Sequence, residues 1–178
     1  MSANDDYICL KCSRVNPTCC VLAPGQEKSF FPLSNPEIKV ISAYLETDDF
    51  FVRQINDPDF IARLFRIIPR PRKLIRRGFP LGNFHSRLKT ENNGRCVLLT
   101  RQGCVLPGAI RPVYCRLYPF WFKNNKLAWL NDPLCLAQDK TDNIRGLLRL
   151  FGMEPLKLKQ DFDLMLYNLG LGDPDMLD

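Results

Sequence analysis

Residues 96–135, CVLLTRQGCVLPGAIRPVYCRLYPFWFKNNKLAWLNDPLC, form the most informative segment of this 178-residue chain. The segment carries four of the eight cysteines, and the other four stand within residues 9–20. The full set is Cys9, Cys12, Cys19, Cys20, Cys96, Cys104, Cys115 and Cys135. Because chance seldom gathers cysteines in this way, the clustering predicts that the thiols act together, and it favours metal binding.

Two β-hairpins are predicted within this segment. Residues 96–100 and 104–106 are apolar runs separated by Arg101-Gln102-Gly103, which favours a turn. Residues 119–122 and 126–130 flank a second turn sequence that contains two asparagines. The first hairpin is expected to place one cysteine in each arm.

Amphipathic helices are predicted on both sides of this segment. The sequence SNPE at residues 34–37 is a capping-box start and is followed by apolar residues at helical spacing. A second helix is expected to begin at the DP sequence of residues 57–58 and to end before Pro69. Two C-terminal helices are expected within about 141–170. Residues 70–95 are rich in turn formers and are predicted to be irregular.

Together these elements predict a small single domain of the α+β class that spans residues 1–178. The cysteines are expected in loops and short β-hairpins, with the N-terminal group at residues 9–20 and the second group at residues 96–135, and amphipathic helices are expected to cover them. A length of 178 residues is ordinary for one domain and small for two.

The composition excludes a mainly disordered chain, because 46% of the residues are hydrophobic and 25% are charged. No apolar run approaches the roughly 20 residues that cross a bilayer. Residues 1–6 lack the basic start and apolar centre of a signal peptide. We therefore expect a cytoplasmic protein without a membrane span, and thiols seldom form disulfides in that reducing compartment.

The local spacing of the N-terminal cysteines also favours metal ligation. Cys9-x2-Cys12 allows one tight turn to direct both thiolates to one metal, although thioredoxin-like redox sites share this spacing. Neighbouring side chains tend to point apart, so Cys19 and Cys20 are expected to serve two sites, or one of them stands outside the ligand shell. Buried apolar cysteines, and disulfide or thiol redox chemistry, are the alternative interpretations.

Arginines beside the second cysteine group are suited to offset the charge of thiolates through hydrogen bonds to sulfur. They are Arg95, Arg101, Arg111 and Arg116. Arg111 and Arg116 lie nearest to Cys115 in the sequence and are the principal candidates for this role.

The chain resembles the YkgJ-type cysteine-cluster family. The resemblance rests on the CxxC of residues 9–12, the paired cysteines 19–20, Cys96 and Cys104, and above all on RPVYCRLYPF at residues 111–120. It covers roughly residues 9–135, and the late Cys135 fits the same pattern. Members of this family are described as zinc- or iron-chelating domains and sometimes as iron–sulfur oxidoreductases. The resemblance therefore implies that the cysteines are metal ligands.

An all-sulfur ligand set does not separate an iron–sulfur cluster from Zn²⁺, because both accept four thiolates. We expect one or two centres and place an iron–sulfur cluster, of the [4Fe-4S] type, ahead of Zn²⁺. Three classes of function follow. They are a metal-binding protein with a structural, carrier or sensor role, an iron–sulfur-dependent oxidoreductase or modifying enzyme, and a zinc-stabilised module that binds nucleic acid.

A basic segment and a single histidine are the remaining candidate sites. Residues 63–77 carry seven positive charges and no acid within a chain of net charge +6, so they form either a solvated surface or a binding site for nucleic acid or an acidic protein. The candidate anion-binding residues are Arg70, Arg72, Lys73, Arg76 and Arg77. His85 is the only histidine, and eight cysteines make it unnecessary as a ligand.

Overall fold

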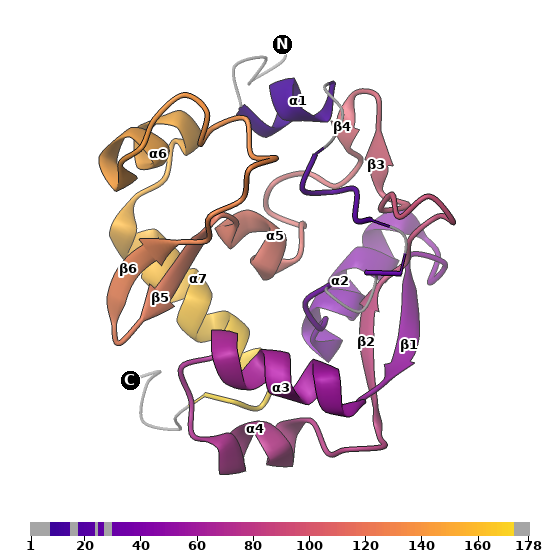
Figure 1. Ribbon diagram of the computed structural model, residues 1–178. Helices are drawn as coiled ribbons and strands as arrows, with labels where there is room; N and C mark the ends of the chain where they lie inside the picture. Colours follow the sequence, from indigo (N-terminus) through magenta and orange to yellow (C-terminus); the bar gives the residue numbers. More distant parts are fainter. Residues whose placement is uncertain (1–7, 15–17, 24, 27–29, 173–178) are drawn as a thin grey trace.

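The computed structural model describes residues 8–14, 18–23, 25–26 and 30–172, without the side chains of Cys9 and Leu10. This part of the chain forms seven helices and three two-stranded antiparallel sheets (Figure 1). The predicted α+β class is therefore confirmed. Within the described residues, no helix has both the length and the apolar character needed to cross a membrane.

The elements follow one another as short helices and short strands. The helices are α1 (Ile8–Ser13), α2 (Asn35–Leu45), α3 (Pro58–Ile67), α4 (Arg72–Gly78), α5 (Val113–Leu117), α6 (Ile144–Phe151) and α7 (Pro155–Asn168). The strands are β1 (Phe51–Ile55), β2 (Phe84–Leu88), β3 (Leu99–Thr100), β4 (Gly103–Cys104), β5 (Phe120–Lys123) and β6 (Lys126–Trp129). The sheets pair β1 with β2, β3 with β4, and β5 with β6.

Local capping signals account for the starts of three helices. Ser34 caps α2 and forms the predicted capping box with Glu37. The side chain of Asp57 accepts a hydrogen bond of 2.8 Å from the backbone N–H of Phe60 at the start of α3. Asn143 caps α6 in the same way. These bonds satisfy N–H groups that the helix itself leaves free. The predicted starts of α2 and α3 are confirmed.

The two predicted hairpins are present, and the second is the longer. Asn124 and Asn125 both have positive φ, 50° and 56°, which is the backbone that a tight two-residue turn between β5 and β6 requires. The first hairpin is reduced to two residues in each strand. Cys104 lies in β4, but Cys96 precedes β3, so the expectation of one cysteine in each arm holds for Cys104 alone.

The prediction that residues 70–95 are irregular is wrong, because α4 and β2 lie within them. Strand β2 pairs with β1 in a register that runs from Phe51 opposite Leu88 to Ile55 opposite Phe84, and α3 and α4 fill the connection. Five-residue strands carry little local signal, and these two are separated in the sequence by α3 and α4.

The expectation that the cysteines occupy only loops and hairpins also needs correction. Cys9 and Cys12 belong to α1, and Cys115 belongs to α5. Both helices are shorter than two full turns, so neither shows the apolar periodicity by which longer helices are recognised.

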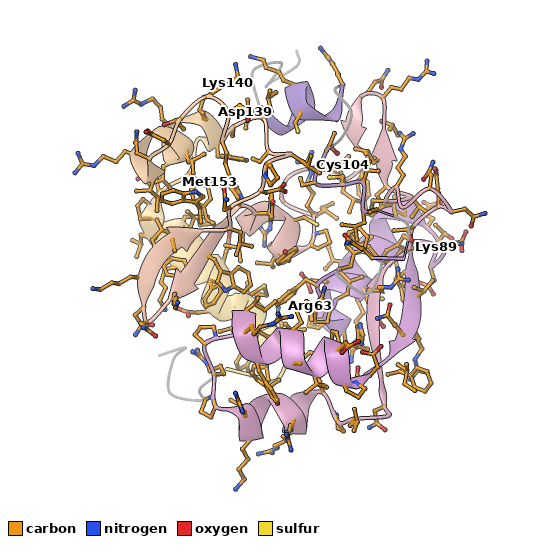
Figure 2. The ribbon with its side chains drawn as sticks, in the orientation of Figure 1. Arg63, Lys89, Cys104, Asp139, Lys140 and Met153 are labelled. Carbon is orange, nitrogen blue, oxygen red and sulfur yellow. The ribbon has the colours of Figure 1, made fainter. Side chains whose placement is uncertain are left out.

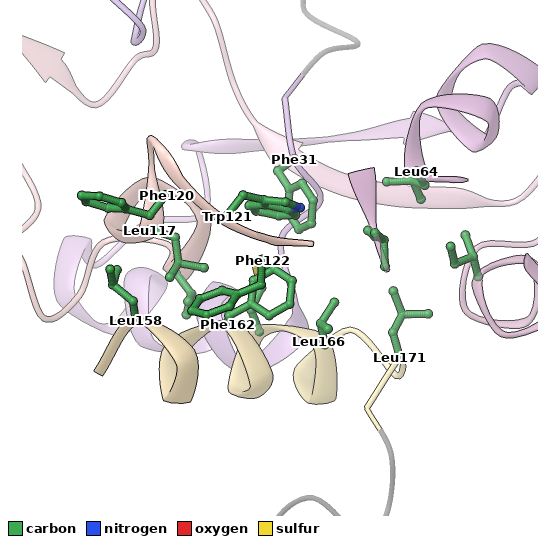
Figure 3. Close-up of a cluster of buried hydrophobic side chains, with 14 of the residues drawn as sticks. Phe31, Leu64, Leu117, Phe120, Trp121, Phe122, Leu158, Phe162, Leu166 and Leu171 are labelled. Atoms are coloured by element: carbon green, nitrogen blue, oxygen red, sulfur yellow. The ribbon is translucent and has the colours of Figure 1, made fainter. Parts of the chain in front are cut away.

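Helix α7 and hairpin β5–β6 form the centre of the larger of two hydrophobic cores (Figure 3). The ring of Trp121 meets that of Phe162 edge to face, with 5.0 Å between centroids. The indole N–H of Trp121 also donates to the carbonyl of Ile67 over 2.6 Å and so ties the hairpin to α3. A fully buried apolar side chain contributes about 1.5–3 kcal/mol, which makes this layer a main source of stability.

A second, smaller core lies under α2 and the strands β1, β2 and β3. Its buried residues are Leu33, Ile41, Phe50, Leu88, Cys96, Leu98, Leu99 and Leu106. Cys20 and Cys104 pack against this core, whereas Cys135 belongs to the larger one. The cysteines are therefore distributed over both cores, and they approach one another where the two cores meet.

Candidate metal centre

The two cysteine groups are joined by backbone pairing between residues 20–22 and residues 94–96. The N–H of Leu22 donates to the carbonyl of Gly94, and the N–H of Cys96 donates to that of Cys20, each over 3.0 Å. Gly94 has a φ of +81°, and a Cβ on it would stand 1.8 Å from the carbonyl oxygen of Leu22. Only glycine permits this approach. The backbone of the N-terminal cysteine segment therefore lies directly against the segment that carries Cys96.

Cys20 and Cys96 adjoin this pairing, and with Cys104 and Cys115 they form what we call the four-cysteine set: Cys20, Cys96, Cys104 and Cys115. In every pair among them, the charge of one thiolate raises the pKa of the other thiol. The four residues come from separate places in the chain, namely the N-terminal segment, the loop before β3, strand β4 and helix α5. Figure 2 labels Cys104.

Helix α5 is placed by a carboxylate from α2. The backbone N–H of Val113, in the first turn of α5, donates to Oε1 of Glu37 over 2.7 Å. The other oxygen of the same carboxylate accepts from the backbone N–H of Ser34 over 2.8 Å. Glu37 therefore connects the start of α2 with the start of α5, two residues before Cys115. The sequence shows only its capping-box role and gives no sign of the second contact.

Cys115 lies in α5, which Figure 1 shows near the middle of the molecule. Its side chain retains accessible surface. Desolvation by the surrounding protein, followed by the charges of Cys20, Cys96 and Cys104, raises the pKa of its thiol well above the ordinary value.

Hydrogen-bond donors are directed at two sulfurs of the four-cysteine set. The backbone N–H of Leu98 donates to the sulfur of Cys96, and that of Leu106 donates to the sulfur of Cys104. The side chain of Arg111 also bonds Cys104, while its Nε donates to the carbonyl of Leu106 over 2.9 Å. Donors of this kind stabilise thiolates and orient metal ligands.

The four thiols differ in how readily they ionise without a cation. Burial raises the pKa of Cys96 to about 12 and also raises the pKa of Cys104. The pKa of Cys20 is lowered instead, first because the thiol of Cys19 donates a hydrogen bond to it and also through the charge of Arg111. A metal cation among these sulfurs supplies the charge that favours the thiolate form of all four.

A second pair of cysteines lies beside this set. Cys12 and Cys135 interact electrostatically, and the backbone N–H of Leu136 donates to the sulfur of Cys12. Both residues are buried. Cys9 lies three residues before Cys12 in α1, but its side chain falls outside the described part of the structure. Cys19 contacts Cys20 and lies near the phenols of Tyr114 and Tyr118.

The arginines near the second cysteine group have different partners. Arg116 lies 3.9 Å from the carboxylate of Asp161 in α7, so this side chain joins α5 to α7. Arg95 donates to the carbonyl of Leu99 over 2.7 Å and acts on Cys96 through its charge. Arg111 is therefore the residue with a hydrogen bond to a thiol, and Arg95 interacts with the set at longer range.

His85 has a structural environment. Its ring stacks on Phe60 with 3.8 Å between centroids, and Nδ1 shares a 2.7 Å hydrogen bond with the amide oxygen of Asn56. Burial, followed by the charges of Arg63 and Arg87, lowers the pKa of His85 to about 4, so the imidazole is neutral near pH 7. Its contacts are thus with the β1–β2 region and α3.

The basic segment 63–77 is divided between interior and surface. Arg63 donates to the carbonyl of Phe30 over 3.0 Å, and Figure 2 shows it on the inner side of α3. Arg70 donates to the carbonyl of Leu171 over 3.1 Å. The guanidinium groups of Arg72 and Arg76 lie over the ring of Phe65, at 5.2 and 5.5 Å from its centroid. Arg70, one of the candidate anion-binding residues, therefore stabilises the fold through its hydrogen bond to Leu171.

The donor chemistry of the four-cysteine set fits a thiophilic metal centre. Thiolates suit iron–sulfur clusters and zinc. Among the described residues, no three Cys, His, Asp or Glu side chains are gathered closely enough to hold a single ion as they stand. No protein-family model matches the chain, and no match was found among curated proteins or among solved structures.

Proposed function

We propose that this protein is a cytoplasmic iron–sulfur protein whose cluster, of the [4Fe-4S] type, is held by Cys20, Cys96, Cys104 and Cys115. The observation that carries the proposal is the mutual proximity of these four thiols, which come from four segments of the chain. The N–H groups directed at Cys96 and Cys104 support it, because donors to sulfur tune such centres. The resemblance to the YkgJ-type family points in the same direction.

An iron–sulfur cluster is preferred to zinc for a geometric reason. Four thiolates around one zinc ion lie at about 2.3 Å from the metal. In a four-iron cluster each thiolate binds a different iron, so the ring of sulfurs must be wider. Among the described residues, no three of these thiols are close enough together to hold a single ion, which is consistent with the wider ring of the larger group. Zinc remains the alternative occupant of the same ligands.

The remaining cysteines are proposed to form a second centre. Cys12 and Cys135 are neighbours that already share one N–H donor, from Leu136. Cys9 precedes Cys12 by three positions in α1, and Cys19 adjoins Cys20 of the first centre. This division gives each member of the Cys19–Cys20 pair a different centre, in agreement with the tendency of neighbouring side chains to point apart.

Purification without oxygen tests the proposal directly. We expect the isolated protein to contain iron and acid-labile sulfide in equal amounts and to absorb visible light as iron–sulfur proteins do. Iron, sulfide and zinc are measured on the sample that gives the spectrum. A colourless protein with about one zinc per four-cysteine set, and without iron, would contradict the iron–sulfur assignment and favour zinc.

The position of the proposed centre favours a structural role, whether or not the protein is also a carrier or a sensor. Its ligands belong to the smaller core, to the N-terminal segment and to α5, whose residues Val113 and Leu117 belong to the larger core. A metal centre here links both cores. A carrier protein would also transfer its cluster to an acceptor protein that lacks one. A sensor protein would also lose its cluster reversibly.

A second function, nucleic-acid binding through α3 and α4, is favoured by the cations on these helices. Five are exposed: Arg66, Arg72, Lys73, Arg76 and Arg77. Stacking on Phe65 restricts the side chains of Arg72 and Arg76 and so lowers the entropy cost of binding a phosphate. The two helices pack against each other, so the five exposed cations lie on adjacent elements. We call these five residues the α3–α4 basic face.

The salt dependence of binding tests this second function. Replacing Lys73 and Arg77 with glutamine is expected to lower the slope of log affinity against log salt by about two, because each lost phosphate contact removes about one released ion. Glutamines at Lys123 and Lys126, exposed on hairpin β5–β6, remove the same charge and should leave the slope unchanged. Equal slopes for all three proteins would contradict a phosphate-binding role for the face.

A further inference from the structure

A surface cavity of about 420 Å³ opens beside the four-cysteine set. Its walls come from the end of α1, the segment after it, the loop before β3 and the β3–β4 turn. The lining residues are Ser13, Arg14, Thr18, Val21, Asn93, Arg95, Leu99 and Arg101. This volume lies within the range of cavities that hold small molecules.

The lining of this cavity is cationic. Three of the described lining residues are arginines, none of those described is acidic, and Ser13, Thr18 and Asn93 add hydroxyl and amide groups. Among the described residues, Nε of Arg95 is a buried donor that lacks a hydrogen-bond partner. The same guanidinium is fixed at its other end by the 2.7 Å bond to the carbonyl of Leu99. Its position is therefore set by the fold, and one of its donors is still unused.

We propose that this cavity binds a small molecule that carries a phosphate or several carboxylates. Guanidinium groups match the oxygens of both anions with paired hydrogen bonds, and Arg95 and Arg101 supply two such groups here. The described part of the lining contains no aromatic ring on which a nucleotide base would stack. The expected ligand is thus a compact phosphate ester or polycarboxylate, and this proposal does not depend on the metal centre.

The cavity shares its walls with the cysteines. The hydroxyl of Thr18 accepts a hydrogen bond of 3.2 Å from the backbone N–H of Cys20, and the N–H of Leu99 donates to the carbonyl of Cys96 over 3.0 Å. Arg101 also lines a second cavity, in which Cys104 takes part. An anion held by Arg95 and Arg101 therefore lies against the segments that carry three members of the four-cysteine set.

Calorimetric titration at constant ionic strength tests the proposal with two probes, glycerol 3-phosphate and tricarballylate, and with glycerol as the uncharged control. We expect one of the two anions to bind at a single site with a dissociation constant below about 1 mM. Replacing the exposed Arg101 with glutamine is expected to weaken this binding at least tenfold, since a charge-assisted bond is lost. The probe that binds identifies the ligand as a phosphate ester or as a polycarboxylate.

Lys123→Gln is the matched control, because it removes one exposed charge from hairpin β5–β6, which lies away from β3 and β4 (Figure 1). This variant should bind the anion within about twofold of the unaltered protein. Equal weakening by Arg101→Gln and Lys123→Gln, or no binding of either anion at 10 mM, would overturn the proposal. The metal content of Arg101→Gln is measured as well. It should be unchanged, so that a failure of the anion site is distinguishable from a failure of the metal centre.

Discussion

Replacing Cys115 with serine is expected to remove the metal from the four-cysteine set and to lower the melting temperature by roughly 10 °C. Cys115 is the member of the set that comes from α5, so in the proposed centre its thiolate would link this helix to the other three ligands. A hydroxyl is a harder donor that iron–sulfur clusters and zinc accept poorly. The metal-to-protein ratio and the melting temperature are measured on samples prepared without oxygen. If the second centre forms as proposed, about half of the iron remains.

His85→Ala is the control for this experiment. The substitution removes the ring stacked on Phe60 and leaves the buried amide of Asn56 without its partner, at a cost of about 2–4 kcal/mol. Both variants are therefore less stable, but His85→Ala should keep its metal. Loss of metal from the His85 variant together with retention in the Cys115 variant would show that the ligand assignment is wrong.

Replacing Gly94 with alanine is expected to destabilise the protein by about 4 kcal/mol or more and to reduce its metal content. The new Cβ would overlap the carbonyl oxygen of Leu22, and the φ of +81° would be strained as well. Relief of the overlap requires residues 20–22 to separate from residues 94–96, which moves Cys20 away from Cys96. Denaturant unfolding and metal analysis measure the two effects.

Gly82 provides a matched comparison for Gly94. Its φ is +80°, nearly that of Gly94, but no atom lies within 4 Å of a Cβ built on it. Gly82→Ala should therefore cost only the backbone strain, about 1–2 kcal/mol, and leave the metal content unchanged. Equal losses in the two variants would mean that the contact between Gly94 and Leu22 has no special importance for the site.

The elements that the sequence predicted well are those whose signals are local. The capping residues Ser34, Asp57 and Asn143 mark helix starts within a few positions of the bonds they make. Asn124 and Asn125 predict the β5–β6 turn, because asparagine tolerates a positive φ. The β1–β2 sheet was not predicted, because α3 and α4 separate its two strands in the sequence. The pairing of the strands is therefore a long-range contact without a local signal. Helix α4 was missed because its seven residues are mostly basic and follow a proline.

For the candidate site, the sequence identified residue types but not their grouping. The tendency of Cys19 and Cys20 to diverge is visible in the sequence, and it leaves open which other cysteines join each of them. That choice depends on the pairing of residues 20–22 with 94–96 and on the placement of α5, both long-range contacts. The Asn-Gly sequence that ends at Gly94 indicates a turn, yet nothing in it shows that the N-terminal segment passes within contact distance.

The shared carboxylate of Glu37 limits which residues position 37 can accept. Its two oxygens receive backbone N–H groups from Ser34 and Val113, so both must be acceptors. Glutamine has the right length but only one acceptor oxygen, and its amide nitrogen would face one of these donors. Aspartate has two acceptors on a side chain that is one methylene shorter. Among proteins that keep this arrangement of α2 and α5, we therefore expect glutamate at this position without exchange, even though the residue is remote from any thiol in the sequence.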